Sequence, residues 1–494
     1  MRKVILLWSW FLTSLSTVLL SIFRPFSAIH VRRLASDINS VVWQAYLLAE
    51  PKSEVWRRRG FEFQKADALD QAMNCYKEAI RLRPDLPQNY FFLANIYRLK
   101  GQYLEGMKIY EHGLILNQTR SIESGMDSLK IRFLDIGFTT YIGFTTNIGH
   151  ISLLDPLVKL MLLGRLSPHQ RIIVTSSNAI ANPCYLNYWK RYLPIIILDS
   201  YQMQSFQSFA EPLLEHVMMW QLSDRFEHMQ VCFNLSEQLW SAEKRPPLLC
   251  LSNSDQVRGR DVLESMGVPK DDWFVCLHVR ENKTKNTRKN ADSDISTYLM
   301  AIESITARGG WVIRMGDPSM TPIPTKPKVI DYAHSKYRTD WMDVFLWASC
   351  YFFIGTSSGP LTVPSTFGVP VLQTNAPGLG LVPSISNSIF ILKLYWLERE
   401  NRLLTFAEML SSPAGWEFSG HFSRLGLKQL DNTPEEINDA VLEMFTRLEG
   451  NNILTNEDIL MHETFSKIRK QFGDVGNMPI ASSFLRKHKI LLET

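Results

Sequence analysis

The chain has 494 residues, of which 45% are apolar and 21% charged, and its formal net charge at pH 7 is +4. This composition is typical of a folded protein and excludes a largely disordered chain, and the small charge excludes a global field directed at nucleic acid. The length allows two or three domains. Six cysteines without any Cys-x-x-Cys pair favour reduced thiols over a disulfide framework or a zinc site; they are Cys75, Cys184, Cys232, Cys250, Cys276 and Cys350.

An uncharged apolar run occupies residues 4–23, directly after two cationic residues. Twenty helical residues span about 30 Å, which is the thickness of a bilayer's hydrocarbon core. A cleaved signal peptide is the alternative, but its apolar stretch is usually shorter, at about 7–15 residues. We therefore expect a transmembrane anchor over residues 1–33. The positive-inside rule places the following part in the cytoplasm, because three cations follow the run: Arg24, Arg32 and Arg33.

Small and aromatic residues then recur at a 34-residue offset. The pattern runs Trp56, Gly60, Phe63, Ala72, Tyr76 and Ala79, and again Tyr90, Ala94, Tyr97, Gly106, Tyr110 and Gly113. This spacing resembles the tetratricopeptide repeat, in which pairs of antiparallel helices pack small residues against aromatic ones. We expect a helical repeat segment over residues 34–125, with a helix at 37–50 covering one end and the following domain covering the other. A plain helical spacer and a platform for a protein partner are both open as its function.

Short apolar runs alternate with helical stretches from about residue 129. The runs at 130–137, 170–176 and 193–199 are typical of buried parallel strands, and residues 200–250 are expected to be helical. These elements predict a first Rossmann-like α/β domain over residues 126–248, with an acceptor-binding role.

A second α/β series follows a Pro-Pro pair near residue 247. Its strands are expected in DWFVCLHVR, GGWVIRMGD, PKVIDY, CYFFIGTSSG and GVPVLQTN, with helices at about 294–308 and 340–348. This predicts a second doubly wound Rossmann-like domain over residues 249–494, which ends in helices. Ligands of such sheets bind beyond the carboxyl ends of the strands.

Side chains that could bind a ligand or take part in catalysis follow the ends of strands in this second series. Arg280 follows one strand and can fork onto two phosphate oxygens, and residues 357–359 are expected to open a helix whose N-terminus favours an anion. A surface ion pair and an ordinary serine N-cap are the structural alternatives. The shared edge favours a pyrophosphate site, for which the candidates are His278, Arg280, Glu281, Arg314, Asp317, Ser357, Ser358 and Gly359.

The segments FVCLHVRE, GGWVIRMGD, DVFLWASCYFFIGTSSGP and STFGVPVLQTN resemble those of bacterial glycosyltransferases found among surface-polysaccharide genes. More distantly, the chain resembles fucosyltransferases that carry His-x-Arg after a strand in a two-domain GT-B fold. The resemblance covers residues 129–400 and implies a GT-B fold and a hexosyl- or fucosyltransferase-like activity. It implies a nucleotide-diphosphate sugar as donor, with no metal and no cofactor.

The same resemblance implies roles for single residues. Arg280 would grip the donor pyrophosphate, and His278 would shape its loop. Phosphate contacts would come from Ser357 and Ser358, and support for the donor from Asp340 or Asp343. Asn282 follows Glu281 where the fucosyltransferases continue with further charged residues, so the sugar is left open.

An Asp-x-Asp pair, Asp292 and Asp294, has the form of a metal-binding motif in nucleotide-sugar enzymes. Asp294 also stands at the start of a helical pattern, where an N-cap explains it more simply. We therefore expect no metal, so the charge of the leaving group would fall on Arg280 and on main-chain amides.

A general base is expected in the segment at 145–157, which follows a strand and opens a helix. His150 suits base catalysis near neutral pH, and Gly149 would allow close approach of a substrate. A capping role for His150 is equally open, and Asp155 is the alternative base.

Two functions agree with these features. The first is a glycosyltransferase that serves a cell-surface glycan or a lipid-linked acceptor, held by a single span in a bacterial inner membrane with its catalytic part in the cytoplasm. The second is a catalytically inactive repeat-bearing scaffold in a membrane polysaccharide-assembly complex. In both, the expected partners include the membrane and a protein bound to the repeats, and exclude nucleic acid.

Overall fold

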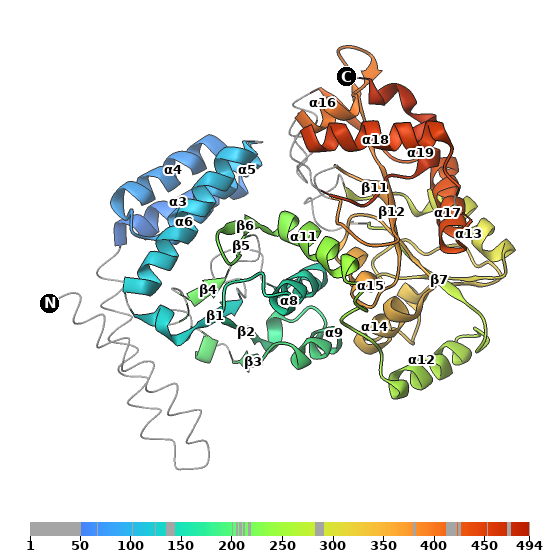
Figure 1. Ribbon diagram of the computed structural model, residues 1–494, viewed down its shortest axis with the longest axis horizontal. Coiled ribbons are helices and arrows are strands. Elements are labelled where there is room, and N and C mark those ends of the chain that lie inside the picture. Colours follow the sequence, from blue (N-terminus) through green and yellow to red (C-terminus); the bar gives the residue numbers. More distant parts are fainter. Residues whose placement is uncertain are drawn as a thin grey trace. The chain divides into compact units, whose positions relative to one another are not determined.

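The computed structural model describes residues 51–493, except for 67, 101, 124, 135–143, 200, 204–205, 207–209, 211–212, 216–218, 282–290, 379–381, 412–421, 423–425, 452 and 472–475 (Figure 1). The predicted anchor at 1–33 and the predicted helix at 37–50 lie outside the described residues. Within the described ranges, none of the helices combines the length and the apolar character that crossing a membrane requires.

The described residues form two compact units. The first contains the residues up to Thr146, together with Leu166–Ile180 and Lys190–Phe226. The second contains Asn147–Arg165, Ala181–Trp189 and the residues from Glu227 onward. This division differs from the predicted boundary near residue 248, because two helical segments between strands of the first sheet pack with the second unit.

Four consecutive helices begin the first unit: α3 (Pro51–Lys65), α4 (Leu69–Leu82), α5 (Pro87–Leu99) and α6 (Tyr103–Glu123) (Figure 1). Each helix packs against the next. A Cβ atom on Gly60 of α3 would lie 2.8 Å from the ring of Tyr76 on α4, and that ring stacks on Phe92 of α5 with 5.4 Å between centroids. The absence of a side chain at Gly60 therefore leaves room for the ring of Tyr76 between these helices.

The first sheet follows in the same unit, with strand order β3-β2-β1-β4 and parallel pairing throughout. Its strands are β1 (Ile131–Leu134), β2 (Gln170–Ser176), β3 (Ile195–Leu198) and β4 (Leu214–Glu215). Helices α5 and α6 pack on the segment that follows β4, since Phe91 of α5 and Leu114 of α6 share an apolar cluster with Met219.

The prediction that residues 200–250 are helical is wrong in part. The described residues contain β4, β5 (Met219–Gln221) and β6 (Phe226–His228) before α11 (Met229–Ala242) begins. Strands of two or three residues are too short to show an alternating pattern, so the aromatic and Met-rich composition indicated helix instead.

The second unit contains a six-stranded sheet of order β12-β11-β10-β7-β8-β9, again with parallel pairing throughout. Its strands are β7 (Phe274–His278), β8 (Trp311–Arg314), β9 (Val329–Ile330), β10 (Phe353–Gly355), β11 (Val371–Ala376) and β12 (Ile389–Leu392). All residues of β7, β10, β11 and β12 are buried, which is why they form near-continuous apolar runs in the sequence. The predicted mixed α/β class with parallel sheets is confirmed.

Two groups of helices accompany this sheet. In the first, α13 (Leu299–Ala307) packs on α17 (Pro434–Leu448); in the second, α12 (Asn253–Ser265) and α9 (Pro183–Tyr188) pack on α14 (Asp340–Ser349). Further described elements include α7 (Ile148–Ile151), α8 (Leu154–Leu162), η6 (Ile295–Tyr298), η8 (Gly359–Thr362), α15 (Val363–Thr366), β13 (Leu394–Leu397), β14 (Arg402–Leu403), β15 (Leu427–Leu430), α16 (Phe406–Ser411), α18 (Asn456–Gln471) and α19 (Ser482–Lys487).

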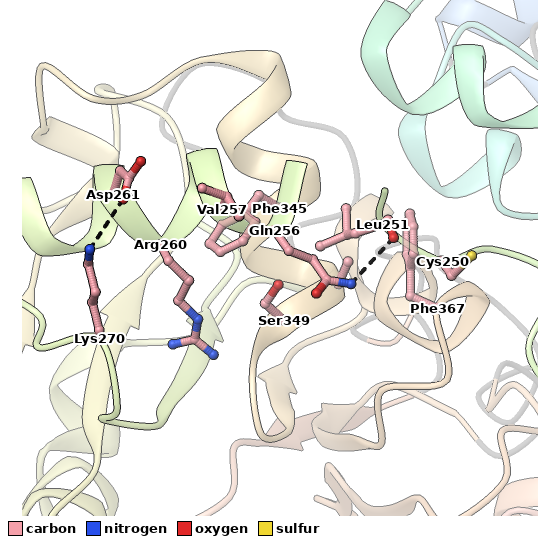
Figure 2. A pocket seen from close by; sticks show the side chains of 11 residues that line it. Cys250, Leu251, Gln256, Val257, Arg260, Asp261, Lys270, Phe345, Ser349 and Phe367 are labelled. Carbon is pink, nitrogen blue, oxygen red and sulfur yellow. Dashed lines mark hydrogen bonds and ion pairs between the residues drawn. The ribbon is translucent and has the colours of Figure 1, made fainter. Parts of the chain in front are cut away.

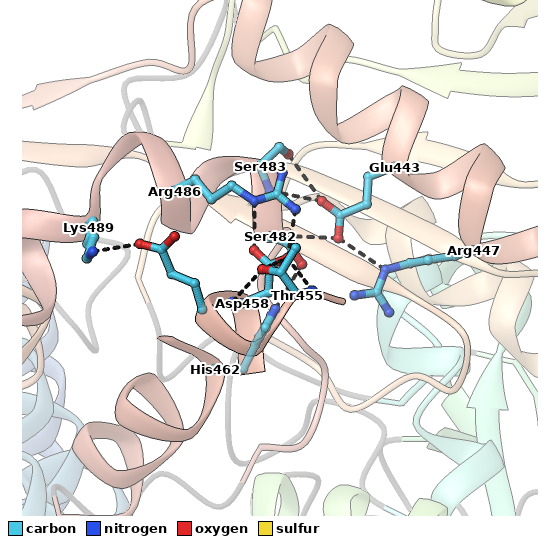
Figure 3. Close-up of polar contacts among 10 residues, drawn as sticks. Glu443, Arg447, Thr455, Asp458, His462, Ser482, Ser483, Arg486 and Lys489 are labelled. Atoms are coloured by element: carbon cyan, nitrogen blue, oxygen red, sulfur yellow. Dashed lines mark hydrogen bonds and ion pairs between the residues drawn. The ribbon is translucent and has the colours of Figure 1, made fainter. Parts of the chain in front are cut away.

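A buried carboxylate on α17 fastens the start of α19 (Figure 3). Glu443 accepts hydrogen bonds of 3.0 Å from the main-chain N–H groups of both Ser482 and Ser483, and its side chain is only 8% exposed. The first N–H groups of a helix have no partner within the helix, so this carboxylate satisfies donors that would otherwise be buried unpaired.

We expect Glu443→Ala to lower the free energy of unfolding by about 2–3 kcal/mol, because it removes charge-assisted hydrogen bonds from buried donors. Glu457→Ala is the matched control, since Glu457 forms an exposed ion pair with Lys489 at 2.6 Å. Exposed pairs of this kind contribute about 0–1 kcal/mol. Urea unfolding of both variants measures the difference, and equal losses would contradict the role given to Glu443.

Candidate functional site

The predicted phosphate-binding residues lie at the carboxyl edge of the six-stranded sheet. Strands β7 and β10 are direct neighbours, and His278 at the end of β7 pairs in register with Gly355 at the end of β10. Because the pairing is parallel, the residues that follow both strands emerge at the same edge. The structure thus brings the segment after 278 beside the segment after 355.

Arg280 is fixed at this edge through its main chain and its side chain. Its N–H donates to Oγ1 of Thr356 at 2.9 Å, and its carbonyl accepts from the N–H of Ser293 at 3.0 Å. Its Nε donates to Oδ1 of Asp292 at 2.9 Å, and both side chains are about one-fifth exposed. In the described part of the chain, no hydrogen-bonding partner engages the two terminal nitrogens of this guanidinium.

His278 is buried beneath Arg280 and is held neutral. Burial, reinforced by the charges of Arg314 and Arg280, lowers the pKa of His278 to about 4. Its Nδ1 lies 3.1 Å from Oγ of Ser358, which donates its single proton to the carbonyl of Thr356. His278 thus links the end of β7 to the turn after β10.

The turn that carries His150 packs against that same segment. A Cβ atom on Gly149 would lie 2.9 Å from the carbonyl oxygen of Gly359, so two glycines are needed for this close approach. Oγ of Ser152 and Oγ1 of Thr362 are hydrogen-bonded at 2.6 Å. His150 itself is half-buried on α7. The predicted base thus belongs to the same compact unit as the predicted phosphate site, although it was expected in the other domain.

Asp155, the alternative base, lies in a buried ion cluster. Its Oδ2 is 2.7 Å from Nζ of Lys159, which also lies 3.1 Å from Glu237 on α11. Burial raises the pKa of Asp155 to about 6, against the opposing charge of Lys159. Lys159 thus joins Asp155 on its own helix to Glu237 on α11, and the buried carboxylate of Asp155 is not presented to a substrate.

Two other candidates support the loop between β8 and β9. Oε2 of Glu281 accepts from the N–H of Thr321 at 2.8 Å and from its hydroxyl at 2.7 Å. Arg314 is completely buried and donates to Asp331 at 3.2 Å and to the carbonyl of Thr321 at 3.1 Å. Arg314 therefore acts on the edge through its charge and its hold on the loop, and its burial excludes a direct ligand contact in this conformation.

The remaining carboxylates stand further along the edge. The pKa of Asp317 is lowered by a hydrogen bond from Ser319 and further by Arg338, which donates to the main-chain carbonyl just before Asp317. Asp340 and Asp343 lie in the first turn of α14, and burial raises the pKa of Asp343 to about 6. Within the described residues, none of these carboxylates forms a hydrogen bond or ion pair with His278, Arg280 or Ser358.

The helix expected to begin at residues 357–359 is shorter than predicted. The structure has one 3-10 turn at Gly359–Thr362 and one α-helical turn at Val363–Thr366, each with a proline at its start. Proline lacks the N–H that a longer helix would need, so the macrodipole contribution is small. Ser357 is buried, and its hydroxyl accepts from Nε2 of Gln373 at 2.8 Å.

Both aspartates of the Asp-x-Asp pair are engaged within the protein. Asp292 pairs with Arg280, and Asp294 caps η6 by accepting from the N–H of Ser296 at 2.8 Å. Across the described ranges, no three His, Cys, Asp or Glu side chains cluster in a way that could hold a metal ion.

A pocket among the described residues lies elsewhere (Figure 2). It has a volume of about 600 Å³ and includes Ser349 at the end of α14, just before β10 begins, so it belongs to the amino edge of the sheet. Lys270 pairs with Asp261 at 3.6 Å, and Arg260 donates to a main-chain carbonyl at 3.3 Å. None of the predicted site residues lines this pocket.

Sequence reasoning missed the two partners that orient Arg280. Thr356 stands in the segment CYFFIGTSSG, directly before the candidate Ser357, so its position was a usable signal. The pairing of Asp292 with Arg280 had no such signal, since an aspartate twelve residues along the chain carries no periodic relation to the arginine.

Comparisons with known proteins give distant similarities. No protein-family model matches the chain. A 110-residue segment is 28% identical to human protein O-mannosyl-transferase TMTC1, covering 21% of this chain and 12% of that protein, so the chain spans about an eighth of the length of this curated relative. Two solved structures have a TM-score of 0.36. E. coli ADP-heptose lps heptosyltransferase II is 14% identical and covers 65% of this chain and 100% of its own. The glycosyl transferase family 9 protein from Veillonella parvula is 13% identical and covers 50% of this chain and 84% of its own.

The buried imidazole makes stability depend on pH. The folded-state pKa of His278 is about 4, below the usual 6.5, so the unfolded chain takes up a proton before the folded one as the pH falls. Stability is therefore lost between about pH 6.5 and 4, and His278 should contribute a loss of about 2 kcal/mol between pH 7 and 5.

His278→Gln retains a hydrogen-bonding side chain without the titration, so we expect its unfolding free energy to fall by about 2 kcal/mol less than the parent's over that range. Urea unfolding at pH 7 and pH 5 measures both losses. His112→Gln, at an exposed position, should keep the parent's pH dependence. Equal losses in the parent and His278→Gln would show that His278 titrates normally in the folded state.

Proposed function

We propose that this protein is a glycosyltransferase that moves a sugar from a nucleotide-diphosphate donor to a glycan or lipid-linked acceptor. The donor pyrophosphate binds at the carboxyl edge of the six-stranded sheet, beside Arg280 and the turn at 356–359. The sugar is of the hexosyl or fucosyl type, and the fold is of the GT-B type.

One observation carries this proposal: the guanidinium of Arg280 is fastened at Nε by Asp292, while its two terminal nitrogens have no partner among the described residues. A planar pair of donors suits two oxygens of a phosphate or pyrophosphate. The main chain of Arg280 is tied to Thr356, two residues before the Ser358–Gly359 turn, so main-chain N–H groups lie nearby. This is an anion site placed where ligands of parallel sheets bind.

The reaction follows from these parts. The acceptor hydroxyl attacks the anomeric carbon of the donor, the bond from that carbon to the diphosphate oxygen breaks, and the hydroxyl proton passes to a base. The negative charge that grows on the leaving diphosphate is stabilised by Arg280 and by the amides of the turn. We assign the base to His150, because its turn packs on Gly359, whereas Asp155 is held in an ion cluster.

The donor site is proposed to work without a metal or a cofactor. The Asp-x-Asp pair is the motif that would hold Mg²⁺ or Mn²⁺, but one of its carboxylates orients Arg280 and the other caps η6. Arg280 supplies the positive charge in place of a cation. Arg314, Glu281 and His278 support the edge from below, and Asp317, Asp340, Asp343 and Ser357 flank the donor.

The N-terminal parts of the chain are proposed to hold the enzyme at a membrane and to bind a protein partner. Residues 1–33 form a single-pass anchor in a bacterial inner membrane, supported by the uncharged run at 4–23, and the catalytic part is cytoplasmic. Helices α3–α6 act as a tetratricopeptide-like array for a protein partner, supported by the packing of Tyr76 on Gly60 and of Phe91 on Gly113.

Arg280→Ala should abolish binding of the donor nucleotide while the fold persists. Thermal unfolding with and without ADP, CDP, GDP or UDP measures this, because a saturating ligand adds roughly 2–4 kcal/mol to the parent's stability. Arg280→Lys should also fail, since an ammonium cannot form the two-pronged contact.

Arg399→Ala is the matched control for this experiment, because Arg399 is exposed and forms an ion pair with Glu400. It should keep the parent's ligand-induced shift. If nucleotide stabilises Arg280→Ala against thermal unfolding as much as it stabilises the parent, the assignment of the pyrophosphate site is wrong.

His150→Ala should slow sugar transfer at saturating donor by about 10²–10⁴-fold, the usual contribution of a general base. Nucleotide affinity should change little, because His150 acts on the acceptor proton. His112→Ala, at an exposed histidine of the helical segment, should transfer sugar at the parental rate. A rate for His150→Ala within about threefold of the parent's would make His150 structural.

A further inference from the structure

A short segment fastens Arg280 to the far side of the sheet. We call residues 291–294 the bridging segment. At one end, the N–H of Ser293 donates to the carbonyl of Arg280 at 3.0 Å, next to the end of β7. At the other, Nζ of Lys393 donates to the carbonyl of Asp292 at 2.7 Å, and Lys393 directly follows β12. Since β10 and β11 lie between β7 and β12, the segment bridges four strand ends.

Lys393 is an unusual anchor for such a segment. Its side chain is only 2% exposed, and its Nζ lies 2.8 Å from Oδ1 of Asp431. A buried ammonium is costly unless it is paired and hydrogen-bonded, and here one carboxylate and one carbonyl satisfy it. The fold therefore maintains a buried cation whose described partners are Asp431 and the main chain of Asp292.

Three further contacts make the bridging segment rigid. Ala291 is completely buried, and Asp294 caps η6. The hydroxyl of Tyr298 at the end of η6 is bonded to Thr374 at 2.6 Å and to Asn375 at 3.1 Å, both on β11. Asp292 is thus presented to Arg280 from a fixed main chain.

The hydrogen bond from Arg280 to Asp292 determines which edge of the guanidinium is available. A guanidinium can bind a phosphate side-on through Nε and one terminal nitrogen, or end-on through both terminal nitrogens. Because Asp292 occupies Nε, only the end-on mode is open. Without Asp292, the side chain could rotate among its rotamers and would have to be ordered when the ligand binds.

We propose that Asp292 is a positioning residue of the donor site, which holds the guanidinium of Arg280 in the orientation for end-on pyrophosphate binding. This inference rests on the proposed function. Asp292 does not touch the donor; it acts through Arg280. The negative charge of Asp292 weakens binding of a diphosphate, whereas its hydrogen bond to Arg280 strengthens it. Substitutions that remove the charge with or without the hydrogen bond separate the two contributions.

The test measures pyrophosphate affinity by calorimetry, with inorganic pyrophosphate in place of the unidentified donor. Asp292→Ala should weaken binding by about 3–10-fold, the range for one oriented hydrogen bond. Asp292→Asn should bind as tightly as the parent or more tightly, because its amide oxygen still accepts from Nε and the repelling charge is gone. In an Arg280→Ala background, Asp292→Ala should cause no further loss, since the two residues act as one unit.

Glu303→Ala is the matched control: it removes an exposed carboxylate that pairs with Lys326 and has no described contact with Arg280, so affinity should be unchanged. If Asp292→Ala binds like the parent while Arg280→Ala does not, the positioning role is overturned and the donor site stands. Equal weakening of Asp292→Asn and Asp292→Ala would also overturn it. If Arg280→Ala itself binds pyrophosphate normally, the proposed function and this inference fail together.

Discussion

The candidate site depends on the parallel register of β7 and β10. Pairing of His278 with Gly355 sends the two following segments out at one edge, where the N–H of Arg280 reaches Thr356 and Nδ1 of His278 reaches Ser358. Antiparallel pairing would have placed these segments at opposite ends of the sheet. A shift of one residue would have turned the side chain of Arg280 toward the other face. The strand pairing in the apolar core of the sheet thus determines the position of the Arg280 guanidinium at the carboxyl edge.

The charged groups at this edge are mostly paired or neutralised, so they orient the hydrogen-bond donors of Arg280 more than they add net positive charge to attract an anion. Arg314 is paired with Asp331 beneath the surface, His278 is kept neutral by burial, and Arg280 is partly balanced by Asp292. A site with three uncompensated cations would bind a diphosphate tightly and release it slowly. Pairing Arg314 and Arg280 and keeping His278 neutral leaves one oriented set of donors, which would suit the proposed release of a nucleoside diphosphate after each transfer.

The sequence predicted the parts of the fold that carry a repeated or continuous signal. The run at 274–278 is apolar up to its last residue because β7 is buried along its whole length, and the apolar centre of the run at 170–176 appears as the middle of β2. The two-residue strand β4 carries no comparable signal. Asp155 and Lys159 stand at i and i+4 on a helix, a spacing that favours an ion pair over a free base and was visible in the sequence. The contact from Lys393 to Asp292 joins residues 101 positions apart, and no local pattern could reveal it.

The position of His150 has a consequence for how catalysis would be organised. Its turn approaches Gly359 so closely that neither Gly149 nor Gly359 can carry a side chain without displacement, and Ser152 is bonded to Thr362. The proposed base and the proposed phosphate site are therefore packed directly against each other. Their separation is determined by packing inside one compact unit, so substrate binding does not have to assemble it. The position of the acceptor hydroxyl is the part of the arrangement that this packing does not determine. Specificity for the acceptor should therefore come from residues that do not bind the donor.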